Sequence, residues 1–317
     1  MNLSQFISDY PVILAPMSGI TDFPFRSLVK NLGAGLLVSE MIASSGMIKR
    51  TKDSLQKSHI QSNTAVQLAG CDPVIMAEAA KLNEDMGAQI IDINFGCPVK
   101  KVVNNYAGSA LMKDEMTAAK ILEAVVKAVK VPVTLKMRIG WDSQNLNSPR
   151  LAKIAENIGI KMITIHGRTR TQMFTGKADW KFISNIKKCV RIPIIVNGDI
   201  KTLDDIKIAL EESQADGIMI GRGAYGKPWI INKALQFIKS GIILPDPTVS
   251  EKLQIIINHY DNIIEHYGKD IGVKISKKHI GWYSAYLENS TEFRSKVNCS
   301  NNHQFIRDQI LNFFSPK

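Results

Sequence analysis

Cysteine is scarce in this chain, and no two cysteines stand close together. The 317 residues include only four, Cys71, Cys97, Cys189 and Cys299. A zinc site or a redox pair needs a Cys-x-x-Cys spacing, and a disulfide scaffold needs a far higher density. We therefore expect no metal and no disulfide framework, and the spacing suits a reducing cytoplasm.

Long apolar runs are also missing. None approaches the roughly 20 residues that a helix needs to cross a bilayer. The start, Met1–Gln5, has no basic segment followed by an apolar one, so no secretory signal is visible. We expect a soluble, cytoplasmic protein with no membrane partner.

Acidic residues are fewer than basic ones. The sequence contains 40 lysines and arginines but 29 aspartates and glutamates, which gives a formal net charge of +11. This surplus favours a polyanionic partner such as nucleic acid. Several basic residues follow predicted strands, where they would form a mouth suited to phosphates. They are Lys49, Arg50, Lys52, Lys57, Lys100, Lys101, Arg168, Arg170 and Lys177.

What the chain does contain is a regular alternation of short apolar runs and helix-like segments. Eight such repeats predict an α/β protein with a (β/α)8 TIM barrel, and a doubly wound parallel sheet is the alternative. The predicted strands are Val12–Ala15, Gly35–Ser39, Ala65–Ala69, Ile90–Asn94, Val133–Met137, Met162–His166, Ile194–Asn197 and Gly217–Ile220.

The pattern changes after Leu244. Pro245 and Pro247 disfavour helix and predict a linker. Thr248 and Glu251 then match a capping box that begins a helix, and no strand alternation follows. We predict a barrel domain over residues 1–244 and a small all-helical domain over residues 245–317.

One predicted strand ends in a thiol. Ile90–Asn94 leads into Phe95, Gly96, Cys97 and Pro98. Active sites of parallel α/β folds lie at the carboxyl ends of strands, which favours a chemical role for Cys97. Most cysteines are small buried hydrophobes, so its position alone also allows a packing role.

Glycines follow the last two predicted strands. The residues from Gly221 to Gly226 match G-x-G-x-x-G, but they follow the last strand, which makes them a weak dinucleotide fingerprint. In a barrel, the loops after strands seven and eight commonly bind phosphate through backbone N–H groups. The predicted phosphate-binding residues are Asn197, Gly198, Asp199, Gly221 and Arg222.

Polar side chains interrupt the apolar strands. Lys136 is costly to bury unless an anion meets it. A reduced flavin, anionic around N1 and the C2 carbonyl, would be such a partner, whereas a head group that reaches solvent is the alternative. Gln67 could bond a heterocycle edge, and His166 ends its strand beside Arg168 and Arg170.

Together these residues resemble the tRNA-dihydrouridine synthases, and the bacterial B-type subgroup most of all. The resemblance covers most of the chain. Its motifs are Leu14–Asp22 with Arg26, Val38–Met41, Asp92–Lys101, Leu135–Arg138, His166–Arg170, Asn197–Ile200, Gly221–Gly223 and Lys277–Tyr283. Ser18 stands where the family has alanine or glycine, and Lys277 where arginine is commoner.

The resemblance implies an FMN-binding barrel fed by NADPH, and a helical domain that recognises tRNA at the D-loop. We separately expect a monomer. Flavin N5 would deliver hydride to uracil C6, and Cys97 would donate a proton to C5. Asn94, Arg138 and Arg168 would orient the uracil.

The resemblance also assigns cofactor contacts. Pro16, Met17 and Ser18 would cradle the flavin ring, with Gln67 and Lys136 at its polar edge. The ribityl phosphate end would be held by His166, Asn197, Gly198, Asp199, Gly221 and Arg222.

Two other functions stay open at this point. A flavin dehydrogenase of a small pyrimidine, similar to those that act on dihydroorotate, would need neither the basic mouth nor the helical tail. A barrel that binds RNA without catalysis would carry no flavin.

Overall fold

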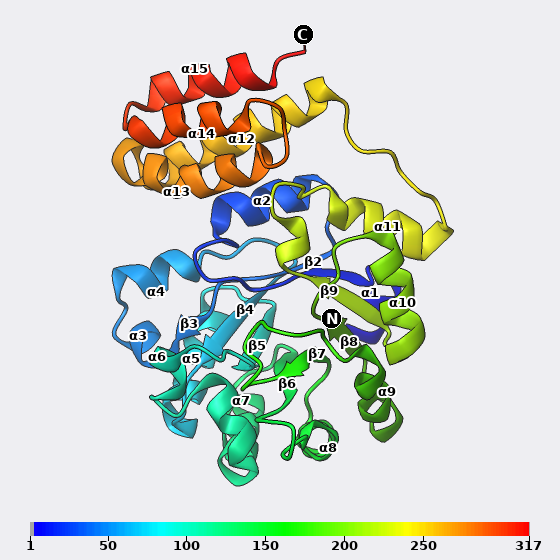
Figure 1. The fold of residues 1–317 in the computed structure, drawn as a ribbon. Helices are drawn as coiled ribbons and strands as arrows, with labels where there is room; N and C mark the ends of the chain where they lie inside the picture. The colour runs from blue at the N-terminus through cyan, green and yellow to red at the C-terminus, as the bar shows by residue number, and fades with distance from the viewer. Residues whose placement is uncertain (1–2, 317) are drawn as a thin grey trace. The chain divides into compact units, whose positions relative to one another are not determined.

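The computed structural model describes residues 3–316, which form two compact units (Figure 1). The first consists of the chain up to Asp22 and of Ala34–Gly221, and the second of Phe23–Gly33 and the chain from Arg222 onward. The predicted domain boundary after residue 244 falls inside the second unit, because Leu32 and Trp229 pack into that unit's core. The functional extent of each domain stays a prediction.

The first unit is a closed barrel of eight parallel strands, as the sequence predicts. Its strands are β1 (Val12–Leu14), β2 (Leu36–Val38), β4 (Thr64–Ala69), β5 (Ile90–Phe95), β6 (Val133–Gly140), β7 (Ile163–Thr169), β8 (Ile194–Asn197) and β9 (Gly217–Ile220). Pairing of β1 with β9 and of β2 with β4 closes the ring. The (β/α)8 fold is thereby confirmed over the doubly wound alternative.

A ninth strand, β3 (Ile42–Ala43), pairs with β4 beyond the ring. Helices surround the barrel strands, as Figure 1 shows. They are α1 (Leu3–Asp9), α3 (Ser44–Ile48), α4 (Lys52–Lys57), α5 (Pro73–Asp85), α6 (Lys100–Val103), α7 (Glu115–Ala128), α8 (Ser148–Ile158), α9 (Trp180–Cys189), α10 (Leu203–Ser213) and the 3-10 helix η1 (Gly108–Lys113).

Apolar side chains from successive strands fill the barrel. Ile13, Leu36, Ile90 and Ile195 belong to one buried cluster, which Leu3 and other residues of α1 and the strands complete. Burial of this kind contributes about 25 cal/mol per Å² of apolar surface. The core therefore holds the strands in register and fixes the side chains at their carboxyl ends.

Side-chain caps begin two of the helices, and the second of them is the capping box predicted from the sequence. Asp72 accepts hydrogen bonds from the backbone N–H groups of Val74 and Ile75, with Pro73 at the first helical position. Thr248 and Glu251 form a capping box at the start of α12 (Val249–Tyr267). Such caps each contribute about 0.5–2 kcal/mol.

The second unit is helical. Its elements are α2 (Phe23–Asn31), η2 (Arg222–Ala224), α11 (Ile230–Ser240), α12, α13 (Lys269–Tyr283), α14 (Ser290–Cys299) and α15 (His303–Phe314). A core that includes Ile256, Val273, Phe293 and Ile310 holds them together. Within residues 3–316 no helix combines the length and apolar character needed to cross a membrane.

Candidate active site

Cys97 lies in the loop after β5, and this loop is held on both sides. The Asn94 side-chain oxygen accepts hydrogen bonds from the backbone N–H groups of Gly96 (3.1 Å) and Cys97 (2.8 Å). The Cys97 carbonyl accepts from the Ser109 N–H (3.1 Å) and hydroxyl (2.9 Å). The thiol is therefore carried on a fixed segment at the carboxyl end of the barrel.

Burial raises the pKa of the Cys97 thiol, although a Val99 N–H and the charges of Arg138 and Lys136 act in the opposite direction. A raised pKa keeps a thiol protonated at neutral pH, whereas a nucleophilic cysteine needs a lowered one. The side chain is partly buried, and the other three cysteines are exposed. Cys97 is thus suited to donate a proton.

A chain of buried polar side chains lies below the loop. The Gln67 amide nitrogen donates to the Asp92 carboxylate (2.7 Å), and the Asn94 amide nitrogen donates to the Gln67 oxygen (2.8 Å). The Thr134 hydroxyl donates to the other Asp92 oxygen (2.5 Å). Neighbouring strands bring them together, since Gln67 pairs with Asp92 and Asp92 with Thr134 in register.

Lys136 places its positively charged ammonium group in this region. Its ammonium donates to the Asn197 side-chain oxygen (3.1 Å), and the Asn197 amide nitrogen donates to the Met219 carbonyl (2.8 Å). Burial, with the charge of Arg138, lowers the pKa of Lys136 to about 8. Among the described residues, Asn197 is the one hydrogen-bond partner of an ammonium with three donors, which leaves it able to meet a further acceptor.

Arg138 ties the Cys97 loop to the loop after β7. Its Nε donates to the Gly96 carbonyl (2.8 Å), and its Nη1 donates to the carbonyls of Thr169 (2.7 Å) and Met173 (2.8 Å). Its guanidinium also lies over the Phe174 ring, 5.6 Å from the centroid. Burial and the charge of Arg168 lower the pKa of Arg138 to about 10.

A second cluster joins the ends of β7 and β8. The buried Arg168 forms an ion pair with the partly exposed Asp199 (2.6 Å), and its Nη1 lies 3.3 Å from His166 Nε2. Gly198 has φ +113°, and a Cβ there would come within 2.7 Å of the His166 ring and 2.9 Å of Ala178. This close approach requires glycine at position 198, and it packs the buried Gly198 backbone against the His166 ring.

The structure brings the ends of the first and last strands together as well. A Cβ on Gly221 would meet Met17 Sδ at 3.4 Å. Met17 donates its N–H to the Thr21 hydroxyl (2.8 Å), and Ser18 is exposed. Arg222 is exposed and begins η2 in the second unit.

The residues predicted to orient uracil fall into two places. Asn94 and Arg138 both hold the Cys97 loop, whereas Arg168 lies with Asp199 and His166. Contact with a base stays a prediction for all three.

The sequence reasoning did not single out Asp92, Thr134 or Ser109. Of these three, only Asp92 could have been identified from the sequence, because a carboxylate inside the apolar run Ile90–Ile93 is costly to bury without hydrogen-bond donors.

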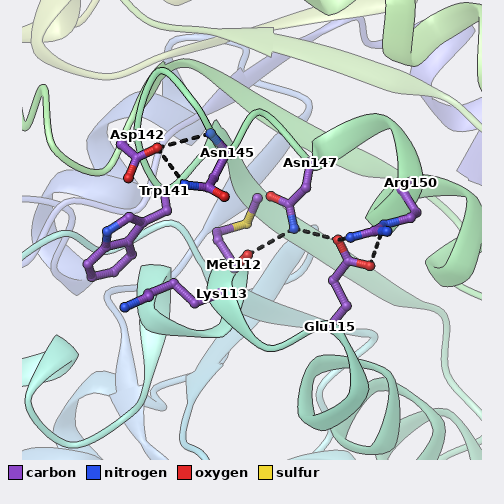
Figure 2. Close-up of a pocket in the computed structure, with 8 residues that line it drawn as sticks. All are labelled: Met112, Lys113, Glu115, Trp141, Asp142, Asn145, Asn147 and Arg150. Atoms are coloured by element: carbon purple, nitrogen blue, oxygen red, sulfur yellow. Dashed lines mark hydrogen bonds and ion pairs between the residues drawn. The ribbon is translucent and has the colours of Figure 1, made fainter.

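A pocket of about 410 Å³ also went unpredicted (Figure 2). It lies beyond β6, and Lys113 and Arg170 place cations 4.8 Å and 4.7 Å from the centroid of its Trp141 ring. Figure 2 shows Glu115 bound by Arg150 and Asn147 at the other end. The lining residues are Met112, Lys113, Glu115, Trp141, Asp142, Asn145, Asn147 and Arg150.

Comparison with solved structures supports the fold. The chain resembles histamine dehydrogenase from Rhizobium sp. 4-9 with a TM-score of 0.50 and 14% identity, over 80% of this chain and 49% of that one. At this identity the likeness concerns the barrel fold alone.

Comparison with protein sequences gives the family. A probable tRNA-dihydrouridine synthase from Rickettsia bellii is 58% identical over 96% of this chain and 94% of its own length. A protein named tRNA-dihydrouridine synthase B, from Pseudomonas putida, is 44% identical over 100% of this chain and 95% of its own length. One of the same name from Xanthomonas axonopodis pv. citri is 47% identical over 90% and 87%. The model of the dihydrouridine synthase (Dus) family matches residues 13–313, and the chain belongs to this family.

Proposed function

We propose that this protein reduces the C5=C6 bond of uridines in the D-loop of tRNA to 5,6-dihydrouridine, with FMN as its cofactor and NADPH as the reductant. The family membership and the names of the relatives support this activity. The single observation that carries it is the partly buried Cys97 thiol on a fixed loop at the carboxyl end of β5.

The residues present fit an FMN. The ammonium of Lys136, whose pKa is lowered, is a cation that an electron-rich ring edge would stabilise. Gln67 on β4 pairs with Asp92 on β5, and β5 pairs with β6, the strand that carries Lys136. Near Gly198 the Asp199 carboxylate is neutralised by Arg168, so it would not repel a phosphate. The ring would rest on Pro16, Met17 and Ser18. The residues assigned to the phosphate end are His166, Asn197, Gly198, Asp199, Gly221 and Arg222.

Bound FMN, reduced by NADPH, would supply the hydride for uracil C6. The conjugated C4 carbonyl makes C6 electrophilic and leaves C5 basic after the addition. The Cys97 thiol then donates its proton to C5, and the charges of Arg138 and Lys136 stabilise the thiolate left behind. Asn94, Arg138 and Arg168 would orient the base.

The tRNA would reach this site as a partly unstacked loop, since extracting a base from its stack costs a few kcal/mol. Lys113 and Arg170 suit its phosphates, because an aromatic ring holds a cation without neutralising it. Within residues 3–316 neither cation forms an ion pair with a carboxylate. We assign tRNA recognition to the helical domain over residues 245–317 and expect a monomer in the cytoplasm.

The test is Cys97→Ala in the purified protein loaded with FMN. We expect the variant to retain FMN and its reduction by NADPH, and to lose at least about 100-fold in dihydrouridine formation on tRNA, within the range for general acids. Cys71→Ala, at an exposed thiol, is the matched control and should retain activity.

Three results would contradict parts of the proposal. Full turnover by Cys97→Ala would remove the proton-donor role. Reduction of free pyrimidines but not of tRNA would favour a small-molecule dehydrogenase. A protein that stays colourless after FMN is supplied would favour RNA binding without catalysis. Mass-spectrometric mapping of dihydrouridine in tRNA from a strain lacking the gene would identify the uridine.

A further inference from the structure

We propose that Asp92 is a positioning residue that fixes the Cys97 loop through Gln67 and Asn94. The catalytic consequence rests on the proposed function, but the structural relay does not. Among the described residues, the Asp92 side chain forms hydrogen bonds with Gln67 and Thr134 and none with the loop, so its role follows from the direction in which the hydrogen bonds run.

The relay begins at the buried carboxylate. Asp92 is 3% exposed and receives hydrogen bonds from the Gln67 amide nitrogen and the Thr134 hydroxyl. A carboxylate can only accept, whereas an amide has one donating and one accepting end. Asp92 therefore compels Gln67 to turn its nitrogen toward β5 and leaves the Gln67 oxygen to face Asn94.

Asn94 connects Gln67 to the loop, and Gln67 sets the orientation of the Asn94 amide. Because the Gln67 oxygen accepts, Asn94 must present its amide nitrogen to it, at 2.8 Å. The Asn94 oxygen is then turned toward the N–H groups of Gly96 and Cys97. In the opposite orientation the Asn94 amide would point its hydrogens at two backbone donors, and both hydrogen bonds would be lost.

The carbonyl side of the loop does not depend on this chain. Ser109 donates to the Cys97 carbonyl, and Arg138 donates to the Gly96 carbonyl. Loss of the Asp92 carboxylate should therefore release the N–H side alone. The thiol would move more freely and become more accessible, while the barrel and the rest of the loop stay in place.

The experiment measures the alkylation of each cysteine by iodoacetamide, peptide by peptide, in the full-length protein at neutral pH. In Asp92→Leu we expect Cys97 to react about tenfold faster or more, since two hydrogen bonds are lost. The exposed thiols of Cys71, Cys189 and Cys299 are internal references and should not change. With tRNA, kcat should fall.

Three further variants separate the relay from general destabilisation. Asp92→Asn keeps an acceptor toward Gln67 while its amide nitrogen can donate to Thr134, so it should restore slow Cys97 alkylation. Thr134→Val removes a hydrogen bond to Asp92 but leaves the direction of the relay, so Cys97 should stay slow. Gln67→Met breaks the relay one step later and replaces Asp92→Leu if that variant does not fold.

The proposal is overturned if Asp92→Leu or Gln67→Met leaves Cys97 alkylation unchanged, or if Thr134→Val accelerates it equally. Neither outcome depends on tRNA reduction. A wild-type protein inactive on tRNA would instead contradict the proposed function and leave the alkylation result valid.

Discussion

Both compact units bury polar side chains, but they satisfy them in different ways. In the barrel, Asp92, Gln67 and Asn94 form a chain in which each side chain has partners on both sides. In the helical unit, the rings of His259 and His279 lie 4.7 Å apart, and among the described residues neither Nε2 has a hydrogen-bond partner. The barrel cluster thus depends on hydrogen-bond direction, and the histidine cluster on staying neutral.

The electrostatics of the histidine pair agree with this difference. Burial, aided by the charge of Lys278, lowers the pKa of His259 to about 3. Burial and the neighbouring His259 and Lys278 hold the pKa of His279 well below its usual range. His259 also has the Tyr283 hydroxyl 3.0 Å from its Nδ1. A proton added to either ring would be a buried charge with no anion beside it.

Of the effects that follow from this comparison, the largest is the acid sensitivity of the helical unit. The unfolded state takes up a proton on each histidine below pH about 6.5, whereas folded His259 does not until about pH 3. Its contribution to stability is therefore complete above pH 6.5 and is lost as the pH falls. We expect a loss of about 2 kcal/mol for His259 between pH 7 and pH 5. Hydrogen exchange followed by mass spectrometry would measure it separately in each unit.

In the double variant His259→Leu, His279→Leu the stability of the helical unit should change less with pH, whatever its value at pH 7. His59→Leu, at an exposed histidine of the barrel unit, is the matched control and should leave it unchanged. Equal acid sensitivity in the double variant and the wild type would remove the distinction between the two clusters.

Lys136 differs from the two buried histidines, because it is a barrel residue whose charge changes near neutral pH. Its pKa of about 8 means that the ammonium becomes neutral as the pH rises past that value. Since an electron-rich flavin edge favours the ammonium, FMN affinity should fall above pH 8, by at most about tenfold per pH unit. Titrations of flavin fluorescence between pH 7 and pH 9 would measure this.

In Lys136→Met the FMN affinity should be lower than in the wild type at pH 7, and the difference should be smaller at pH 9. Lys127→Met, at an exposed lysine paired with Glu123, should behave as the wild type does. If the pH dependence persists in Lys136→Met, another group is responsible and Lys136 does not contact the flavin.

The barrel itself could be predicted because each strand is an apolar run that ends in a polar loop. The two-residue β3 and the short α1 could not, since neither is long enough to show a period. That α2 belongs to the helical unit could not be predicted either, because it depends on contacts between residues far apart in the sequence. Phe25 lies against His259 and His279.

The site was predictable in part, for the same reason. Cys97 and Lys136 stand out in the sequence because a thiol or an ammonium at a strand end is unusual. The link from Asp92 to Gln67 and on to Asn94 depends on the register of β4 against β5, which pairs Gln67 with Asp92. Sequence periodicity indicates which face a residue takes but not which residue lies opposite, so the relay became visible only in three dimensions.

The smallest effect we predict concerns the two cations at Trp141, the exposed Lys113 and the half-buried Arg170. If Lys113 and Arg170 contact tRNA phosphates, Lys113→Ala and Arg170→Ala should each weaken tRNA binding a few-fold and lower the slope of log affinity against log salt by about 0.7. Trp141→Leu should weaken binding as well, since the ring places both cations. Lys127→Ala removes an equal charge away from the pocket and should leave the slope unchanged. An identical slope in Lys113→Ala, Arg170→Ala and the control would show that these cations do not bind the RNA, and that its phosphates are met elsewhere.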